Sequence, residues 1–166
     1  EITDANGNKQ TVVSDTDVKI ADSPIVFDDY HYGEYYDARN EIADWNKPCF
    51  DDSNWKNAII AETPKGEICS CVAEPILKRA EYKPVSITPY EDGYVYDFGV
   101  NDSGLCKLQI KGQSGQKVKM FYAETLVDGK PFLDVRVDNA DCFQLDWYIC
   151  SGIGTECYMP RFTYHG

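Results

Sequence analysis

Three kinds of side chain in this sequence are suited to chemistry: carboxylates, histidines and cysteines. There are 28 Asp and Glu residues, two histidines (His31 and His165) and seven cysteines. Neither histidine stands in the residue spacing of a nucleophile elbow or of a metal site. The cysteines lack Cys-x-x-Cys spacing, which argues against a zinc ribbon. These residue types therefore identify no catalytic residue, and the sequence predicts none.

The cysteines predict free thiols rather than a disulfide framework. Their number is odd and their spacing is irregular. Free cysteines are usually buried and are typical of a reducing compartment, so we expect mostly buried thiols, no disulfides and a cytoplasmic location. One or two disulfides are the alternative. The residues concerned are Cys49, Cys69, Cys71, Cys106, Cys142, Cys150 and Cys157.

The net charge of −12 restricts the classes of partner. Nucleic acids and anionic membrane surfaces are bound through clustered Lys and Arg, so neither is expected here. No apolar run approaches the roughly 18 residues that a membrane span needs. The residues that follow Glu1 do not form a signal peptide. A neutral sugar and a cation such as calcium are compatible with this charge.

The elements that must position these side chains are strands and tight turns. Residues 106–111 and 117–122 alternate apolar and polar side chains across the turn cluster 112–115, which predicts a hairpin with one solvent-exposed face. Asp92-Gly93 opens a predicted strand, and Asp128-Gly129 predicts a second tight turn. The spacing of these turn signals predicts an all-β fold, as an antiparallel β-sandwich or jelly roll.

One further strand pattern predicts part of the core. Phe143, Leu145, Trp147 and Ile149 are spaced two residues apart, and side chains with that spacing lie on one face of a strand. We therefore expect these four side chains to face the interior of the sandwich.

Little of the sequence favours helix, and nothing in it marks a boundary between domains. Three prolines between residues 75 and 89 predict edge strands or an extended connection. A single helical turn is expected near residues 51–54, where several side chains can cap it. Repeats and a clear linker are absent. The prediction is one domain over residues 1–166.

Five motifs in this sequence occur together in a known family. Residues 31–39 (HYGEYYDAR) resemble the signature GExYDAR, and residues 45–55, from Trp45 to FDDSNW, resemble W…FDDSxW. Residues 96–104 resemble YDFGQNxxG, residues 121–129 resemble xYAExLxxDG, and residues 160–166 (PRFTYHG) resemble the start of PRFTYHGFRY. In these motifs the chain is similar to the bacterial α-L-rhamnosidases of glycoside hydrolase family 78.

The resemblance implies a non-catalytic role. In that family these motifs lie in β-sandwich domains, similar to galactose-binding domains, ahead of a catalytic (α/α)₆ barrel that works by inversion. The barrel would follow Gly166 and is not part of this chain. With 28 acidic residues, pairs at the roughly 6.5–9.5 Å of an inverting site arise by chance, so such pairs are no sign of catalysis. We expect an accessory domain whose partners are the barrel and other domains of a parent enzyme.

A second resemblance suggests an alternative function. The chain is similar to the rhamnose-binding module of some rhamnosidases, in which calcium bridges protein and sugar. Asp37 matches that module's acidic residue, whereas Ala38 stands in place of its asparagine. The implied sugar-binding residues are Asp37, Arg39, Trp45 and Asn101, and the implied calcium ligands are Asp37, Asp97 and Glu124, because calcium prefers oxygen ligands. The competing interpretation is a structural ion pair between Asp37 and Arg39.

Two tryptophans and one turn have structural alternatives. Trp45 either stacks on a sugar or packs in the core. Trp55 ends a Phe-Asp-Asp-x-x-Trp stretch that is common in galactose-binding-like jelly rolls, and we expect it in the core. Gly99 and Asn101 are expected in a tight turn, because both residue types tolerate positive φ.

The last residues predict the beginning of a strand. Residues 160–164 place Phe162 and Tyr164 on one strand face, and Gly166 would cut that strand short. We expect a strand edge there that pairs with a second copy of the chain or with a crystal neighbour. Arg161 and Tyr164 either pair within that strand or face a neighbouring domain.

Overall fold

The computed structural model describes residues 1–67, 69–133 and 144–166. In these ranges the chain forms strands and one short 3₁₀ helix, η1 (Ala38–Asn40), and it forms no α-helix. The expected all-β fold with very little helix is confirmed. Over the same ranges, no helical segment has the length and hydrophobicity that crossing a membrane requires.

Contacts divide the chain into two compact units. The first contains residues 1–22 and 42–75, and the second contains residues 23–41 and 76–166. The expectation of a single sandwich domain over residues 1–166 stays a prediction, and each unit is described by itself.

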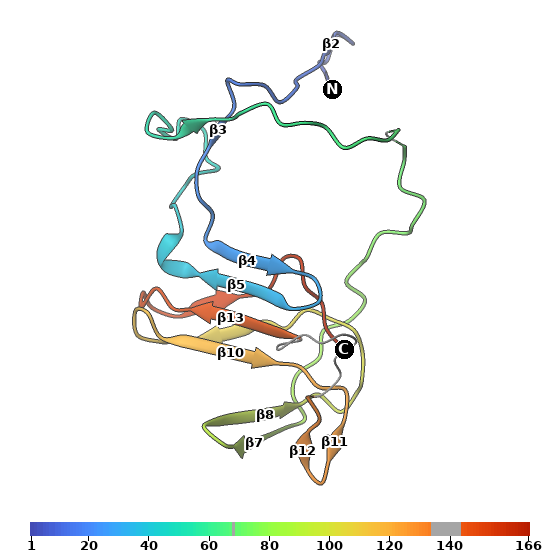
Figure 1. Cartoon of the computed structure of the whole chain (residues 1–166), viewed down its shortest axis with the longest axis vertical. Helices are drawn as coiled ribbons and strands as arrows, with labels where there is room; N and C mark the ends of the chain where they lie inside the picture. Colours follow the sequence, from blue (N-terminus) through green and yellow to red (C-terminus); the bar gives the residue numbers. More distant parts are fainter. Residues whose placement is uncertain (68, 134–143) are drawn as a thin grey trace. The chain divides into compact units, whose positions relative to one another are not determined.

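A four-stranded sheet organises the second unit. Its strands are β4 (Ile25–Asp29), β5 (Gly33–Asp37), β13 (Leu145–Ile149) and β10 (Lys117–Phe121), side by side in that order in Figure 1. The strand pairs β4–β5 and β10–β13 are antiparallel, as expected, but β13 and β5 are parallel. The expectation of antiparallel pairing throughout is wrong at this place, because the direction of two strands so distant in sequence depends on the chain path between them.

A second, two-stranded sheet pairs β9 (Leu108–Ile110) with β14 (Glu156–Tyr158) in antiparallel fashion. The predicted hairpin of residues 106–111 and 117–122 is therefore wrong. Its turn exists, since the Gln116 N–H donates to the Gln113 carbonyl at 2.9 Å, but β9 and β10 on its two sides join different sheets. The alternating pattern identified both strands correctly and could not identify their partners.

The core of the second unit lies where these two sheets meet. Tyr36 of β5, Tyr148 of β13 and Tyr158 of β14 pack together, with ring centroids 4.9–5.9 Å apart. Cys150 and Ala38 complete the buried cluster. Partly buried apolar side chains pack around it: Ile25, Leu108, Ile110, Val118 and Met120. Apolar residues of both sheets thus share one interior, which confirms the β-sandwich.

The side chains of β13 that face this core are not the predicted ones. The innermost are Asp146 and Tyr148, which are 0% and 3% exposed, and Cys150, directly after the strand, is 0% exposed. Trp147 lies on the opposite face, where it stacks on Tyr35 with ring centroids 4.4 Å apart, although Leu145 is also buried. The predicted inward row of Leu145, Trp147 and Ile149 is wrong because that prediction placed the carboxylate of Asp146 in water. Phe143 lies outside the described residues.

Two hairpins of the second unit confirm local turn predictions. The pair β7 (Ser86–Tyr90) and β8 (Gly93–Asp97) turns at Glu91 and Asp92, and the pair β11 (Leu126–Val127) and β12 (Lys130–Pro131) turns at Asp128-Gly129. Asp128 and Gly129 both have positive φ, 51° and 75°, as a tight hairpin turn requires. In the described chain β7 pairs only with β8, which agrees with an edge position for Pro89.

The first unit contains two short strand pairs. These are β1 (Ile2–Thr3) with β2 (Lys9–Gln10), and β3 (Lys19–Ile20) with β6 (Lys56–Asn57). At residues 51–54, where a helical turn was expected, the chain forms a turn and not a helix. The Trp55 N–H closes this turn by donating to the Asp52 carbonyl at 2.9 Å.

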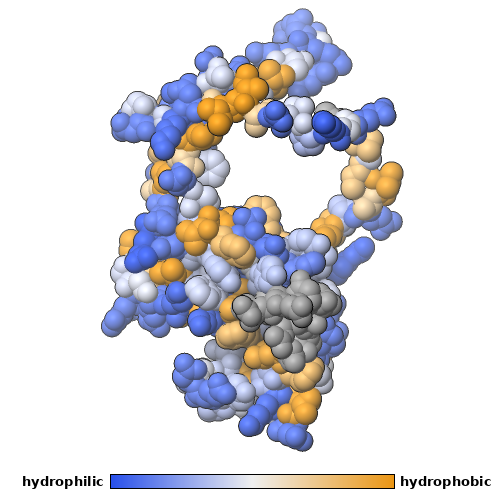
Figure 2. Space-filling view, in the orientation of Figure 1, coloured by the Kyte–Doolittle hydropathy of each residue, from blue (hydrophilic) through white to orange (hydrophobic). Residues whose placement is uncertain are grey.

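Apolar side chains of the first unit are notably exposed. Val12, Val13, Ile59 and Ile60 are 65%, 67%, 85% and 82% exposed. Figure 2 shows hydrophobic residues on the visible face of this part of the chain. Single exposed apolar residues are ordinary, but a group of them marks a surface that other protein commonly covers.

The cysteines are less buried than expected. All six in the described ranges are free thiols, and Cys49, Cys69, Cys71 and Cys157 are exposed, while Cys106 is half-buried and Cys150 is buried. The expectation of mostly buried thiols is therefore wrong, since irregular loops carry several of them. Cys142 lies outside the described residues. The absence of disulfides stays a prediction.

Candidate functional site

Two buried carboxylates, Glu34 and Asp146, form the polar centre of the second unit, and both are 0% exposed. They lie on neighbouring strands, β5 and β13, and the Glu34 N–H donates to Asp146 Oδ1 at 2.7 Å. Gly33 makes this approach possible. A Cβ at Gly33 would lie 2.0 Å from the Leu145 carbonyl oxygen, and its φ of +128° also disfavours other residues.

Asp146 accepts hydrogen bonds at both of its carboxylate oxygens. The Thr163 hydroxyl donates to Oδ1 at 2.9 Å, in addition to the Glu34 N–H, and the Tyr122 hydroxyl donates to Oδ2 at 2.6 Å. Burial by itself raises the pKa of Asp146. His165 beside it and the bonds from Tyr122, Glu34 and Thr163 outweigh burial, so the pKa of Asp146 falls below its usual value.

Glu34 holds the chain that follows β14. Its Oε1 accepts the Tyr158 hydroxyl at 3.1 Å, and its Oε2 accepts the Arg161 backbone N–H at 2.9 Å. Burial, together with the neighbouring negative charge, raises the pKa of the Tyr158 hydroxyl. Glu34 therefore joins β5 to a segment more than 120 residues later in the sequence.

His165 closes this network. Its ring stacks on Tyr122 with centroids 4.2 Å apart, and its Nε2 lies 3.3 Å from Asp146 Oδ2. This distance is short enough for an ion pair, but the geometry of the two groups is not that of a hydrogen bond. The His165 backbone pairs with Gly104 in an isolated bridge.

The predicted strand over residues 160–164 is wrong. The Arg161 N–H and the Thr163 hydroxyl donate to buried carboxylates instead of joining a strand ladder. Phe162 and Tyr164 are exposed, at 57% and 53%. Pairing of this edge with a second copy stays a prediction.

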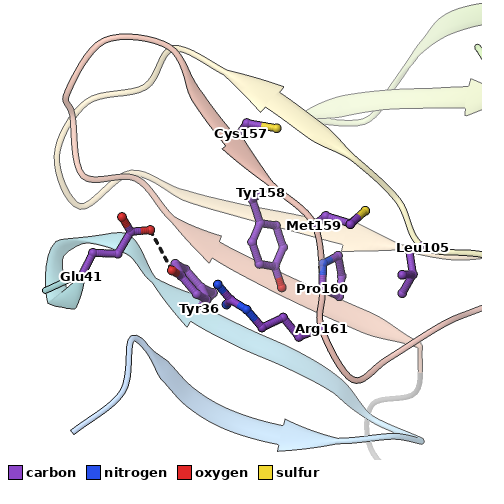
Figure 3. Close-up of a pocket in the computed structure, with 8 residues that line it drawn as sticks. All are labelled: Tyr36, Glu41, Leu105, Cys157, Tyr158, Met159, Pro160 and Arg161. Atoms are coloured by element: carbon purple, nitrogen blue, oxygen red, sulfur yellow. Dashed lines mark hydrogen bonds between the residues drawn. The ribbon is translucent and has the colours of Figure 1, made fainter. Parts of the chain in front are cut away.

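An open pocket of about 400 Å³ adjoins the network. It is lined by Tyr36, Glu41, Leu105, Cys157, Tyr158, Met159, Pro160 and Arg161. The Tyr36 hydroxyl donates to Glu41 Oε1 at 2.7 Å, and the Arg161 guanidinium lies 5.4 Å from the Tyr36 ring centroid (Figure 3). Burial, with the bond to Glu41, raises the pKa of Tyr36 to about 12, so its hydroxyl remains a donor at neutral pH.

Asp37 and Arg39, both predicted to bind sugar, form an ion pair. Arg39 Nη2 donates to Asp37 Oδ2 at 2.6 Å, and Nε donates to Oδ1 at 2.8 Å. The Arg39 backbone N–H also donates to Oδ1, which caps η1. These bonds, led by that from the Arg39 side chain, lower the pKa of Asp37. The ion-pair interpretation therefore describes this loop.

The other predicted residues, Asp97, Asn101 and Glu124, have surroundings of their own. Asp97 caps a turn by accepting the Gly99 N–H at 2.7 Å, and Gly99 has the positive φ, 71°, that the sequence led us to expect. Asn101 and Glu124 are exposed. Among residues 1–67, 69–133 and 144–166, no three acids, cysteines or histidines are placed to hold a metal ion. Both Asp37 oxygens accept hydrogen bonds from Arg39, and calcium binding by Asp37, Asp97 and Glu124 stays a prediction.

The two tryptophans of the first unit differ in their surroundings. Trp55 is partly buried and packs edge-on against Phe50, with ring centroids 5.4 Å apart, as a core residue does. Trp45 is 61% exposed, so the core interpretation of Trp45 is wrong. Sugar stacking by Trp45 stays a prediction.

Comparison with known proteins agrees with the motifs. Residues 1–80 match the family model described as the α-L-rhamnosidase N-terminal domain, and residues 87–166 match the bacterial α-L-rhamnosidase concanavalin-like domain. The chain belongs to the α-L-rhamnosidase family. It is 34% identical over its full length to an α-L-rhamnosidase of Streptomyces avermitilis, and 32% identical over 97% of its length to one of Formosa agariphila. It spans only 16% and 17% of those two relatives.

Solved α-L-rhamnosidase structures contain the same fold. The enzyme from Dictyoglumus thermophilum matches 98% of this chain with a TM-score of 0.87 and 39% identity. The Streptomyces avermitilis enzyme, solved in complex with L-rhamnose, matches 99% with a TM-score of 0.88 and 34% identity. The chain covers 18% and 16% of those two structures, so it corresponds to a small part of a rhamnosidase that includes the N-terminal domain.

The network explains two of the rhamnosidase motifs. Glu34 is the acid of the GExYDAR-like motif, and Arg161, Thr163 and His165 belong to the PRFTYHG motif. Their hydrogen bonds bring the two ends of the second unit together. Sequence reasoning missed Glu34 and Asp146 as a centre. The sequence signal that could have identified them is an acid inside each of two aromatic strands, β5 and β13.

Proposed function

We propose that this chain is the non-catalytic accessory part of an α-L-rhamnosidase and that it supports hydrolysis of terminal α-L-rhamnosides by the rest of the parent. One observation carries the proposal. The chain is similar to α-L-rhamnosidases over nearly its whole length, yet it spans only 16–18% of the curated relatives it matches.

The surroundings of the two buried acids, Glu34 and Asp146, are those of structural residues and not of catalytic ones. A glycosidase acid or base must exchange a proton with substrate or water. Glu34 and Asp146 are 0% exposed, and both oxygens of each accept hydrogen bonds from the protein. These carboxylates are therefore suited to holding strands together.

The partners in this proposal are the catalytic barrel and other domains of the parent. The exposed apolar residues of the first unit support it, because Val12, Val13, Ile59 and Ile60 would lose contact with water against another domain. Burying one such side chain fully contributes roughly 1.5–3 kcal/mol.

Activity measurements on the parent enzyme test this proposal. The whole enzyme, the enzyme without residues 1–166, and the chain alone are assayed with an aryl α-L-rhamnoside, alongside melting temperatures. We expect turnover by the whole enzyme, none by the chain, and a lower melting temperature after the deletion. Turnover by the chain that disappears in Glu34→Gln or Asp146→Asn would overturn the proposal, as would a deletion that changes neither activity nor stability.

We further propose a reducing compartment, the cytoplasm, for the natural protein. The six free thiols among the described residues support it, since four of them are exposed and would meet oxidants in an oxidising compartment. Mass spectrometry of protein taken from its own cells, with free thiols blocked at lysis, tests this. A stoichiometric disulfide would contradict it.

A further inference from the structure

The first unit contains many apolar side chains but no interior of its own. None of its described residues, 1–22, 42–67 and 69–75, is buried. Its two strand pairs, β1–β2 and β3–β6, have only two residues in each strand. A two-stranded ribbon is marginally stable at best in water, and a third strand or another element packed on its apolar face is needed for stability. The unit as described therefore lacks an element that would stabilise it.

The ribbon formed by β3 and β6 has a cluster of apolar side chains. Val18 and Ile20 are two residues apart, so they share one face, and they are 41% and 44% exposed. Ala58 lies opposite Val18, since its N–H donates to the Val18 carbonyl at 2.8 Å. Ile59 and Ile60 follow directly and are almost fully exposed. Neighbouring exposed apolar residues of this kind mark a surface that other protein covers.

Both edges of this ribbon are open. Within the described ranges β3 pairs only with β6, and β6 pairs only with β3. Val18 and Ala58 form a hydrogen-bonded pair, so the next pair along the ladder, Lys19 and Asn57, directs its backbone N–H and C=O groups outward. An extended segment of another polypeptide can pair with such groups, as in β-augmentation.

The length of the relatives indicates where such a segment comes from. The chain spans 16–18% of the curated relatives it matches, so more than four fifths of a parent of that length lies outside residues 1–166. A second copy of the chain is a poorer partner. Residues 1–22 and 42–75 contain eleven acidic residues and five lysines, and two such units would repel each other.

We propose that a strand from the part of the parent enzyme outside residues 1–166 completes the β3–β6 ribbon. That strand pairs with the outward backbone groups of Lys19 or of Asn57 and extends the apolar face of Val18 and Ile20, which then packs against the domain that supplies the strand. The source of the strand rests on the proposed function, whereas the open edges and the exposed apolar face rest on the ribbon alone.

Hydrogen exchange tests the proposal on two proteins, the 166-residue chain and the whole parent enzyme. Mass spectrometry with fragmentation resolves single amides. We expect the amides of residues 18–20 and 56–60 to exchange quickly in the chain alone and at least about tenfold more slowly in the whole enzyme. The amides of Lys19 and Asn57 decide the kind of partner. Because both point away from the ladder, one of them should become protected only when a strand pairs with it.

A charged substitution in the whole enzyme locates the contact. Ile60→Asp should remove at least about tenfold of the protection at residues 18–20 and 56–60, because a carboxylate is unfavourable in an apolar contact. Ile153→Asp is the matched control, since Ile153 is 82% exposed, as Ile60 is, but lies outside the strands in a bend of the second unit. Unchanged exchange at the β5 and β13 amides verifies that the second unit of each variant is folded.

Several results would overturn the proposal. Equal protection of the ribbon in the chain alone and in the whole enzyme would mean that the chain covers the ribbon itself, and protection that rises with concentration of the chain would identify a second copy. A ribbon unprotected in both proteins would have no partner. Fast exchange at both Lys19 and Asn57 in the whole enzyme would exclude a strand, and equal loss in the two variants would exclude Ile60 from the contact.

The proposed function has a separate test. It fails if deletion of residues 1–166 changes neither the activity nor the stability of the parent, or if the chain alone turns over a rhamnoside. The strand proposal is measured instead by exchange at the ribbon in the intact enzyme, so failure of one is distinguishable from failure of the other.

Discussion

The Asp146→Asn variant tests the buried network most directly. Asp146 accepts from the Glu34 N–H, the Thr163 hydroxyl and the Tyr122 hydroxyl at 2.6–2.9 Å. An asparagine of the same shape keeps only one acceptor oxygen. In its best orientation that oxygen accepts hydrogen bonds from the Glu34 N–H and the Thr163 hydroxyl. The asparagine NH₂ group then donates to the Tyr122 hydroxyl oxygen, and the Tyr122 hydroxyl loses its acceptor at this position.

The magnitude follows from the bonds that change. Hydrogen bonds to a charged group contribute about 1.5–3 kcal/mol each, whereas those between neutral groups contribute about 0.5–1.5 kcal/mol. Replacing three charge-assisted bonds by neutral ones, with one donor left poorly satisfied, should lower the free energy of unfolding by about 2–4 kcal/mol. That is a large part of the roughly 5–15 kcal/mol typical of a domain.

Urea unfolding measured by near-ultraviolet circular dichroism gives the free energies. Hydrogen exchange of the β5 and β13 amides confirms that the second unit is the part affected. Asp28→Asn is the control, because Asp28 is an exposed acid on β4 of the same sheet, and it should change stability by less than about 0.5 kcal/mol. An Asp146→Asn protein as stable as the control would refute the reasoning.

The difference between wild type and Asp146→Asn should also depend on pH. The pKa of Asp146 in the folded protein is below its usual value, so the unfolded chain takes up the proton first as pH falls. The stabilisation is fully present above the unfolded pKa of about 3.9 and is lost as pH falls through the lower folded pKa. The difference in free energy of unfolding between wild type and Asp146→Asn should be constant near pH 7 and should decrease at acid pH.

Three further predictions address the same unit. Gly33→Ala should prevent folding of the second unit or destabilise it by more than about 3 kcal/mol, because the added Cβ would lie 2.0 Å from the Leu145 carbonyl oxygen. Calorimetry measures this loss, and a variant as stable as wild type would contradict the close approach of β5 and β13 at Gly33. Because the pKa of Tyr36 rises from 10 to about 12, stability should decline as pH rises from 10 toward 12, and Tyr36→Phe should reduce that decline. With a thiol reagent, the exposed Cys157 should react quickly and the buried Cys150 slowly, because burial also raises the pKa of Cys150; equal rates would contradict its burial.

Local features of this fold follow from the sequence. The Asp128-Gly129 turn and the hairpin at Asp92-Gly93 depend on a few adjacent residues, so their conformation is encoded where they occur. The alternating residues of β9 and β10 likewise specify strands. The motifs from residues 31–39 to residues 160–166 identify the family, because their order along the chain is itself a signal.

Tertiary structure decided which strands pair and which face is buried. Alternation specifies that a segment is a strand, but the partner and direction depend on the path of the whole chain, so β9 pairs with β14 and β13 runs parallel to β5. Asp146 points inward because Tyr122, Thr163 and the Glu34 N–H reach it there. A buried charge is stable only when such donors surround it, and these donors come from segments that are far apart in sequence and meet only in the folded chain.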